Sequence, residues 1–573
     1  MQFIDKFRIP AIFCAISVIL CALVGWPFAD MGVTDDGPYV LMAHTLASTG
    51  HIIYNGWAAP MLGWQLYLGA AFDKLFGISF TSVRMSTLLV AAMLAFLLER
   101  TYVRLNLSER NATIGTLAFV LFPLYLMLSV TFLTDICGLF AMVVCLYGCL
   151  RAVQASTERS AIGWLCFAVV ANAVCGTARQ ISWLGVLVMV PSALWLLRAQ
   201  RRVLIAGLAA TFAGALFIVA CMHWLARQPY VQHEGLLPKS FPVAHILAEH
   251  LHVFLDIPFQ LLPIFVLFLP QVFKSRPRVL TISLALIAMY IFLAIHHLPS
   301  RRFVVLEPVD GDTIGFNASL MFNYPGLQGD VPRIVNRGTQ IVLTIVSFGS
   351  LVGLILSLLR LRTLPLRETA SVHVSWKEAG VLLVPFTLVY PLLLLDRAAS
   401  SGIYDRYPLV LLMIAIPFLV RFYQERIRSQ LPLASMVLVA IMAVCSITTV
   451  HNTFALDRAR VVMAAELISQ GIPDTAVDNG WEYNLGVELR HANHLNDPRI
   501  VFPADAYKPR SPQSAGCSMF GYEDEPHIHP LYSISFDPNA CYGPAPFAPV
   551  PYSRWFALRP DALYVVRAVP DRR

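Results

Sequence analysis

Long apolar runs occupy most of this chain and leave few folds open to it. Hydrophobic residues make up 57% of its 573 residues and charged residues only 13%, against about 25% charged in a typical soluble domain. Runs of about 17–22 apolar residues recur as far as position 450, and each is long enough to cross a bilayer as a helix. The sequence therefore predicts an all-α polytopic membrane protein.

The apolar runs predict about thirteen transmembrane helices. They lie near 9–28, 81–99, 112–132, 136–152, 161–178, 181–198, 203–224, 257–273, 279–297, 339–359, 379–395, 408–423 and 431–450. Only Arg179 and Gln180 separate the fifth run from the sixth. We therefore expect a transmembrane domain over 1–450 and a separate polar domain over 451–573.

Arginine and lysine residues fall in alternate loops, and this pattern predicts the orientation. Short cytoplasmic loops are enriched in these residues, and the loops that contain Arg100, Arg151 and Arg202 form one alternate set. The N-terminus is then cytoplasmic, and an odd number of spans leaves the tail outside a plasma (inner) membrane. The net charge of +7 follows from this topology. Because the basic residues are dispersed, we expect membrane lipids as partners and no nucleic acid.

The long loops all fall on the predicted external side, at 30–80, 226–256 and 298–338. The short cytoplasmic loops leave no room for a nucleotide-binding domain, which argues against a pump driven by ATP. Within the first external loop, 38–49 has apolar residues at helical spacing and ends at Gly50, while 62–76 is rich in aromatic residues. Both segments are predicted to be amphipathic helices at the membrane interface.

The polar tail is predicted to be a small external α/β domain with a strand at 563–566. Two cysteines, Cys517 and Cys541, lie in this tail, whereas the other nine lie in or beside apolar runs, where cysteine behaves as a small hydrophobe. Disulfides form in oxidising compartments outside the cytoplasm. We therefore expect a Cys517–Cys541 disulfide.

Acids and arginines gather at the predicted external ends of the spans. Charged groups near a bilayer cost several kcal/mol, so a cluster on one side of the membrane predicts a polar site there. The residues that share this side are Asp35, Asp36, Asp135, Arg179, Asp405 and Arg406.

The acids have a structural and a chemical interpretation. Asp35 and Asp36 directly precede the first interfacial helix, and Asp135 begins the fourth span. A carboxylate in such a place can cap a helix N-terminus, or it can act as a general base. The three acids together could also bind Mg²⁺ or Mn²⁺ through oxygen, although we expect no metal or other cofactor.

The arginines have two interpretations as well. Arg179, with Gln180 beside it, offers planar donors that suit a phosphate, but it could also extend to lipid headgroups. Arg406 could pair with Asp405, or it could hold a lipid phosphate together with Tyr407. Weaker candidates for the same site are Arg84, His44, Arg301 and Arg302.

The order of these motifs resembles the GT-C superfamily of integral-membrane glycosyltransferases. The motifs are the acidic pair after the first span, the interfacial helix, Thr134-Asp135 after the third span and Arg406-Tyr407 before a late span. The chain is similar to bacterial enzymes of the protein O-mannosyltransferase and lipid A aminoarabinose transferase type. The likeness is detailed over 35–89, where Val83-Arg84-Met85 enters the second span.

The resemblance implies a transferase with a lipid-linked donor. In such enzymes the catalytic carboxylate lies in the first external loop, which here corresponds to Asp35 or Asp36. The donor is a sugar on polyprenyl phosphate, for which Arg179 and Arg406 occupy suitable places, and the acceptor is a glycan, a lipid or a protein. One departure is the segment 58–63, which lacks the Lys-Pro-Pro of the aminoarabinose transferases and so lacks one phosphate-binding charge.

Two other classes of protein remain open from the sequence. A secondary transporter of lipid-linked sugars would use the acids as cation sites, but it would place them near the middle of the bilayer. A polysaccharide ligase or polymerase with lipid-diphosphate donors would use the arginines of the 298–338 loop. We favour an inverting transfer in which a first-loop aspartate is the general base.

Overall fold

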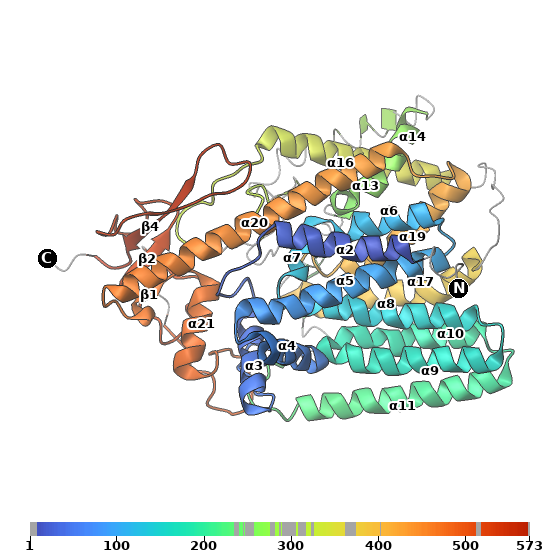
Figure 1. Cartoon of the computed structure of the whole chain (residues 1–573), viewed down its shortest axis with the longest axis horizontal. Helices are drawn as coiled ribbons and strands as arrows, with labels where there is room; N and C mark the ends of the chain where they lie inside the picture. Colours follow the sequence, from blue (N-terminus) through green and yellow to red (C-terminus); the bar gives the residue numbers. More distant parts are fainter. Residues whose placement is uncertain are drawn as a thin grey trace.

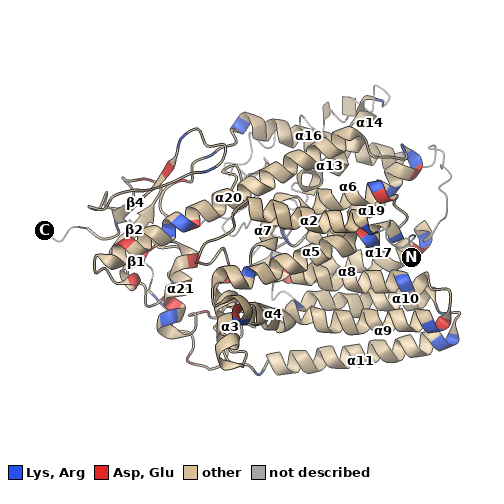
Figure 2. Cartoon of the chain, viewed as in Figure 1, with Lys and Arg blue, Asp and Glu red and all other residues tan. Residues whose placement is uncertain are grey.

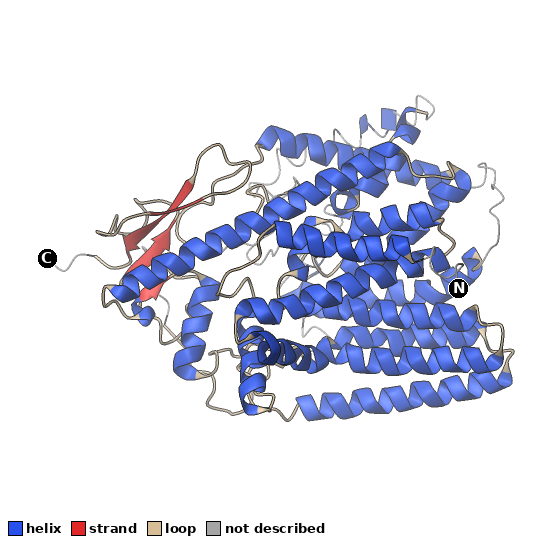
Figure 3. Ribbon diagram, viewed as in Figure 1, coloured by secondary structure: helices blue, strands red, loops and turns tan. Residues whose placement is uncertain are grey.

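The computed structural model describes residues 8–233, 257–274, 317–322, 326–360, 374–400, 403–511 and 517–570, with a few residues between 240 and 306. Helices make up most of the molecule, and a small sheet lies at one end (Figures 1 and 3). The predicted site residues Arg301 and Arg302 lie outside the described residues.

The first half of the chain is a bundle of helices. Its helices are α2 (Ile9–Val24), α3 (Asp36–Thr49), α4 (Gly63–Phe76), α5 (Phe80–Arg104), α6 (Glu109–Val120), α7 (Pro123–Ser129), α8 (Thr134–Val153), α9 (Glu158–Cys175), α10 (Val190–Leu196) and α11 (Arg201–Leu225). Short 3₁₀ and π turns connect α9 to α10, as η1 (Gly176–Ala178), η2 (Gln180–Trp183) and η3 (Gly185–Met189).

The second half adds further helices to the bundle and then a small sheet. Its helices are α13 (Leu262–Phe265), η4 (Val266–Phe268), α14 (Pro270–Phe273), α16 (Arg337–Leu359), α17 (Trp376–Leu393), α18 (Leu395–Ser400), α19 (Leu409–Arg426), α20 (Leu433–Ser469), η5 (Asp474–Ala476) and α21 (Trp481–Ala492). The strands are β1 (Val477–Asp478), β2 (Tyr532–Ser535), β3 (Val550–Tyr552) and β4 (Asp561–Arg567).

The described residues include seven helices that are long and apolar enough to cross a membrane. A bent pair raises this number to eight if it counts as one span, and three shorter apolar helices are also present. The protein is thus a multi-pass membrane protein. The predicted count of thirteen stays a prediction, because part of the span expected over 279–297 lies outside the described residues.

The third predicted span, over 112–132, is broken rather than straight. Helices α6 and α7 meet at an angle of 71°, and Pro123 occupies the first position of α7. Proline has no N–H to continue the ladder of the preceding helix, which accounts for the break. The turn redirects the chain toward Phe132 and the start of α8.

The two segments predicted to be interfacial helices are helical and form α3 and α4. Helix α3 ends where Gly50 adopts a φ of +78°, a left-handed conformation that favours glycine. Figure 1 shows α3 and α4 together at the end of the bundle nearest the sheet. The predicted tail domain contains a sheet of order β1-β2-β4-β3, in which only the β1–β2 pair is parallel.

The tail is tied to the bundle by one long helix. Helix α20 has 37 residues and runs from the bundle into the sheet (Figure 1), so the predicted domain boundary between 450 and 451 falls inside a continuous helix. The strand expected at 563–566 is part of β4. Cys517 and Cys541 form a disulfide, as predicted.

The burial of one acid in the tail makes the folding stability of the protein depend on pH. Glu525 is fully buried, and a side-chain contact with Asn484 is too weak to offset that burial. Burial raises the pKa of Glu525 well above its ordinary value, and nearby Asp478, Asp524 and Glu488 raise it further. The folded protein therefore keeps a proton that the unfolded chain releases above about pH 4.3, and stability falls as the pH rises.

We expect Glu525→Gln to raise the melting temperature of the full-length protein by a few degrees at pH 8 and to change it little at pH 4. The amide removes the cost of a buried carboxylate at the higher pH without changing the size of the side chain. Tryptophan fluorescence of the purified protein in detergent measures this transition. A melting temperature of Glu525→Gln at pH 8 that is equal to or lower than that of the wild type would contradict the expectation.

Candidate active site at the end of the bundle nearest the sheet

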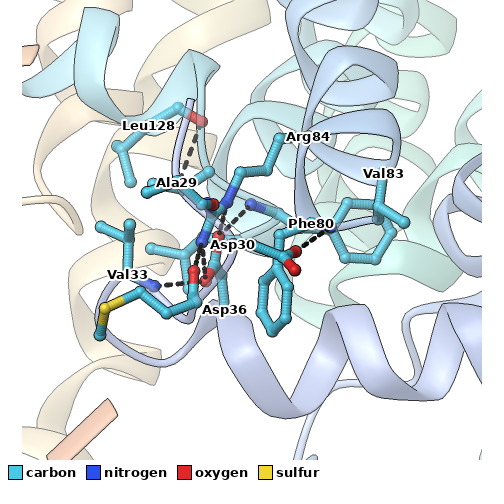
Figure 4. A network of polar contacts seen from close by, with 12 residues as sticks. Ala29, Asp30, Val33, Asp36, Phe80, Val83, Arg84 and Leu128 are labelled. Carbon is cyan, nitrogen blue, oxygen red and sulfur yellow. Dashed lines mark hydrogen bonds and ion pairs between the residues drawn. The ribbon is translucent and has the colours of Figure 1, made fainter. Parts of the chain in front are cut away.

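Asp36 is held by a buried ion pair with Arg84 (Figure 4). Both side chains are fully buried. The Nε and Nη2 atoms of Arg84 donate to the two carboxylate oxygens at 2.8 and 2.9 Å, and the backbone N–H groups of Val33 and Phe132 donate to the same oxygens at 2.7 and 3.1 Å. A carboxylate has about four acceptor positions, so Asp36 has none left for a substrate.

Arg84 also binds the loop that precedes Asp36. Its Nη1 and Nη2 atoms donate to the carbonyl oxygens of Ala29 and Met31 at 3.1 and 2.6 Å. These bonds join the first loop to α5. Asp36 and Arg84 therefore anchor the first loop to α5, and of the two acids predicted as candidates for the base, Asp36 has its acceptor positions filled by the protein.

The turn that presents Asp35 has an unusual backbone. Thr34 has a φ of +54°, a left-handed conformation that β-branched residues rarely adopt. Gly32 and Gly37 approach so closely that a Cβ atom on Gly32 would lie 3.2 Å from the Cα atom of Gly37. Strained residues of this kind cost about 1–3 kcal/mol and gather at functional sites. The turn leaves the Asp35 side chain 22% exposed, beside the fully buried Asp36.

Asp35 belongs to a row of alternating charges. The Nη2 atom of Arg406 donates to Oδ2 of Asp35 at 3.3 Å, and the Nε atom of Arg406 lies 3.8 Å from Oδ2 of Asp135. On its other side, Asp135 forms an ion pair and hydrogen bond with Nη1 of Arg179. The row Asp35, Arg406, Asp135, Arg179 brings together residues from four separate parts of the sequence, as their common sidedness predicted.

Tyrosines pack against both arginines of this row. The guanidinium carbon of Arg406 lies 4.8 Å from the ring centre of Tyr404 and 5.8 Å from that of Tyr407, and Arg179 lies 5.1 Å from the ring of Tyr407. The hydroxyl of Tyr390 donates to the carbonyl of Tyr407 at 2.9 Å. Cation–π contacts hold a guanidinium in place without using its N–H donors.

Arg406 keeps donors for a ligand. Its side chain is only 8% exposed, yet Nε and Nη1 have no hydrogen-bond partner among the described residues. Burial lowers the pKa of Arg406, but Asp135, Tyr407 and Asp35 together outweigh this effect and raise it. The group is therefore a permanent cation, and buried N–H donors without a partner are costly unless a ligand meets them.

Two other predicted site residues bond to the protein framework. His44 lies 3.6 Å from Asp73 and packs edge-on against Phe80. The side-chain amide of Gln180 donates to the carbonyl of Ala59 at 3.1 Å, which joins the turn between α9 and α10 to the first loop. Neither interaction is with the charged row.

Sequence reasoning missed Thr34, Tyr390 and Tyr404. Tyr404 stands two positions before Arg406, so its spacing was a usable signal, whereas the sequence gives no sign that Tyr390 reaches Tyr407. The described residues hold no group of three His, Cys, Asp or Glu side chains that could bind a metal ion. The three acids considered for this role each lie against an arginine.

The tail contacts the site through buried charges. Arg460 on α20 pairs with Asp457 at 3.2 Å and with Glu482 on α21 at 2.9 Å. A Cβ atom on Gly32 would lie 3.5 Å from the Cβ atom of Glu482. Charged residues of the bundle otherwise lie mainly near the ends of its helices (Figure 2), so this buried group marks the junction of the tail with the first loop.

Comparison with known proteins finds similarity only among solved structures. No protein-family model and no curated protein matches the chain. ArnT from Cupriavidus metallidurans, solved bound to undecaprenyl phosphate, is 14% identical, with 96% of each chain covered and a TM-score of 0.38. The apo oligosaccharyltransferase of Archaeoglobus fulgidus is 13% identical, with 90% of this chain and 64% of that chain covered and a TM-score of 0.37.

The protein O-mannosyltransferase complex of Saccharomyces cerevisiae bound to the sugar donor is also similar. It is 16% identical over 38% of this chain and 32% of that chain, with a TM-score of 0.29. At these identities and TM-scores, the donor, the acceptor and the residue roles have to be argued from this chain's own geometry.

Arg84→Met should strongly destabilise the protein, because it leaves the Asp36 carboxylate buried and unpaired. Removal of one partner of a buried ion pair costs about 3–5 kcal/mol. The yield of monodisperse protein from membranes and its melting temperature report this loss. Asp35→Asn is the matched control and should keep both values, since Asp35 is partly exposed. A normal yield and melting temperature for Arg84→Met would show that the pair is not structural.

Proposed function

We propose that the protein is a membrane glycosyltransferase that moves a sugar from a polyprenyl-phosphate donor to an acceptor on the external face. The observation that carries the proposal is Arg406, a buried permanent cation with two nitrogen atoms that lack hydrogen-bond partners among the described residues. Planar guanidinium donors suit a phosphate oxygen, and Asp35 lies within hydrogen-bond distance of the same side chain.

Asp35 is the general base in this proposal. Of the two adjacent acids, Asp36 accepts four hydrogen bonds, and Asp35 alone keeps an exposed carboxylate. Asp135 orients the two arginines and balances their charge. Arg179, whose Nη1 atom is engaged by Asp135, supports Arg406 and adds positive charge near the phosphate.

The proposed reaction is a single inverting displacement. An acceptor oxygen or nitrogen attacks the anomeric carbon, and its proton passes to the Asp35 carboxylate. The bond between the anomeric carbon and the phosphate oxygen breaks, and polyprenyl phosphate leaves with the electron pair. Arg406 stabilises the charge that develops on the leaving oxygen, a role that fixed donors perform well in a site from which water is excluded.

The proposed location is the plasma (inner) membrane, with the N-terminus inside and the tail outside. The arginine-rich loops support this orientation, and the Cys517–Cys541 disulfide fits an oxidising compartment for the tail. The charged row then faces the external leaflet, where a lipid-linked sugar can enter from the bilayer.

Transfer of radiolabelled sugar from polyprenyl-phosphate donors to an envelope fraction tests the proposal. We expect Asp35→Asn to lower the rate by about 10²–10⁴, the usual contribution of a general base. Arg406→Ala should lower it by about 10²–10³, as loss of a transition-state donor does. Asp30→Asn is the matched control in the same loop, because Asp30 is exposed and its one hydrogen bond among the described residues is from the backbone N–H of Phe80.

Wild-type rates in both Asp35→Asn and Arg406→Ala would exclude this mechanism. Movement of the lipid-linked sugar without covalent product would favour the transporter interpretation instead. Protein yield and a single gel-filtration peak establish that each variant is folded, so a lost activity is attributable to the missing group.

Transfer should continue in excess EDTA, because arginines supply the positive charge at the phosphate in this proposal. The measurement is the same transfer assay with and without chelator. Loss of activity in EDTA, restored by Mg²⁺ or Mn²⁺, would contradict the expectation and give the acids of the site a metal-binding role.

A further inference from the structure

A groove lies between α2, α5, α8 and α9, away from the charged row. Its volume is about 960 Å³, near the upper end of the range of about 300–1,000 Å³ for ligand sites. The lining is almost wholly apolar and includes Ala15, Met93, Phe140, Val144, Trp164 and Phe167. These four helices lie side by side in the bundle (Figure 1).

Two arginines stand at one end of this groove. Phe140, Val144 and Tyr147 line it from α8 at spacings of four and three residues, so Arg151 comes next on the same helical face. The guanidinium of Arg151 lies 4.5 Å from the ring centre of Trp164, itself a lining residue. Arg104, the last residue of α5, lies within electrostatic range of both Arg151 and Tyr147.

The positive charge at this end is not balanced locally. Neither Arg104 nor Arg151 forms an ion pair within the described ranges of the chain; Arg104 instead donates to the side chain of Gln154 at 3.0 Å. Of the neighbouring acids, Glu99 pairs with Arg100 at 3.5 Å, and Glu158 lies in the first turn of α9, where the helix dipole favours it.

We propose that this groove binds one anionic phospholipid, with an acyl chain along the apolar lining and the phosphate on Arg151 and Arg104. An apolar channel alone would accept any lipid tail, whereas the unbalanced arginines select a negative headgroup. Gly163 gives the chain room, because a Cβ atom there would meet nothing within 4 Å.

The groove is independent of the proposed transfer. The arginines stand at the end of α8 opposite Asp135, and sixteen residues of helix separate Asp135 from Arg151, a distance of about 24 Å. The ligand is thus a lipid of the opposite leaflet from the proposed donor.

Native mass spectrometry of the full-length protein in detergent tests this proposal with phosphatidylglycerol and phosphatidylethanolamine as probes. We expect one equivalent of phosphatidylglycerol to bind more tightly than phosphatidylethanolamine. Arg151→Gln should weaken phosphatidylglycerol about fivefold, the usual effect of one basic residue near a membrane surface, and Gly163→Leu should abolish the bound equivalent by filling the groove.

Two matched variants serve as controls. Gly380→Leu replaces another helical glycine with open space around it, on α17. Arg198→Gln removes another arginine that lies over a tryptophan, 4.6 Å from the ring centre of Trp195. Both controls should bind phosphatidylglycerol as the wild type does.

Equal binding of phosphatidylglycerol to wild type, Arg151→Gln and Gly163→Leu would overturn the proposal. So would equal affinity for the two probes, or displacement of phosphatidylglycerol from this groove by undecaprenyl phosphate at lower concentration. If Gly163→Leu fails to fold, Arg151→Gln by itself decides the matter, because that residue is partly exposed at a helix end.

Discussion

The buried ion pair between Asp36 and Arg84 is the interaction on which the rest of the site depends. It joins four segments: the loop after α2, the first turn of α3, helix α5 through Arg84, and the backbone of Phe132 just before α8. A buried charge without its partner is strongly unfavourable, so these segments form together or not at all. Asp35 is carried on this rigid support.

The charged row of Asp35, Arg406, Asp135 and Arg179 combines overall neutrality with arginine donors that are not all used within the described residues. Two acids and two arginines alternate, so the row is neutral before any ligand arrives, and tyrosine rings hold the cations without consuming their donors. Nitrogen donors of Arg406 that lack partners within the described part of the molecule are a cost in the free protein. In the proposed function, a phosphate that meets those donors recovers this cost, which would couple donor binding to the electrostatics of the site.

The sequence predicted much of the fold, because its signals are local. Apolar runs indicate spans wherever they occur, Gly50 ends α3 at the expected place, and the two tail cysteines are joined. The sharp bend between α6 and α7 and the length of α20 were not predicted. A span is recognised from mean hydropathy, which is insensitive to a proline break and to whether a helix continues beyond the membrane.

The roles of the site residues were less accessible to sequence reasoning. The predicted location on one side of the membrane placed Asp35, Asp135, Arg179 and Arg406 in one group. The adjacent acids Asp35 and Asp36 could not be told apart, since their neighbours in sequence are the same. Arg84 lies 48 residues after Asp36 in the sequence. It distinguishes the two acids because it forms an ion pair with Asp36, whereas Asp35 pairs with Arg406.

The sequence by itself determined a polytopic helical membrane protein, its interfacial helices and the collection of charges at one end, because hydropathy and sidedness are properties of short segments. Only the tertiary structure decided which acid is buried and which is exposed, which arginine keeps unused donors and where an apolar groove meets unbalanced positive charge. Those outcomes depend on contacts between residues far apart in the chain, whose energies arise only once the helices have packed.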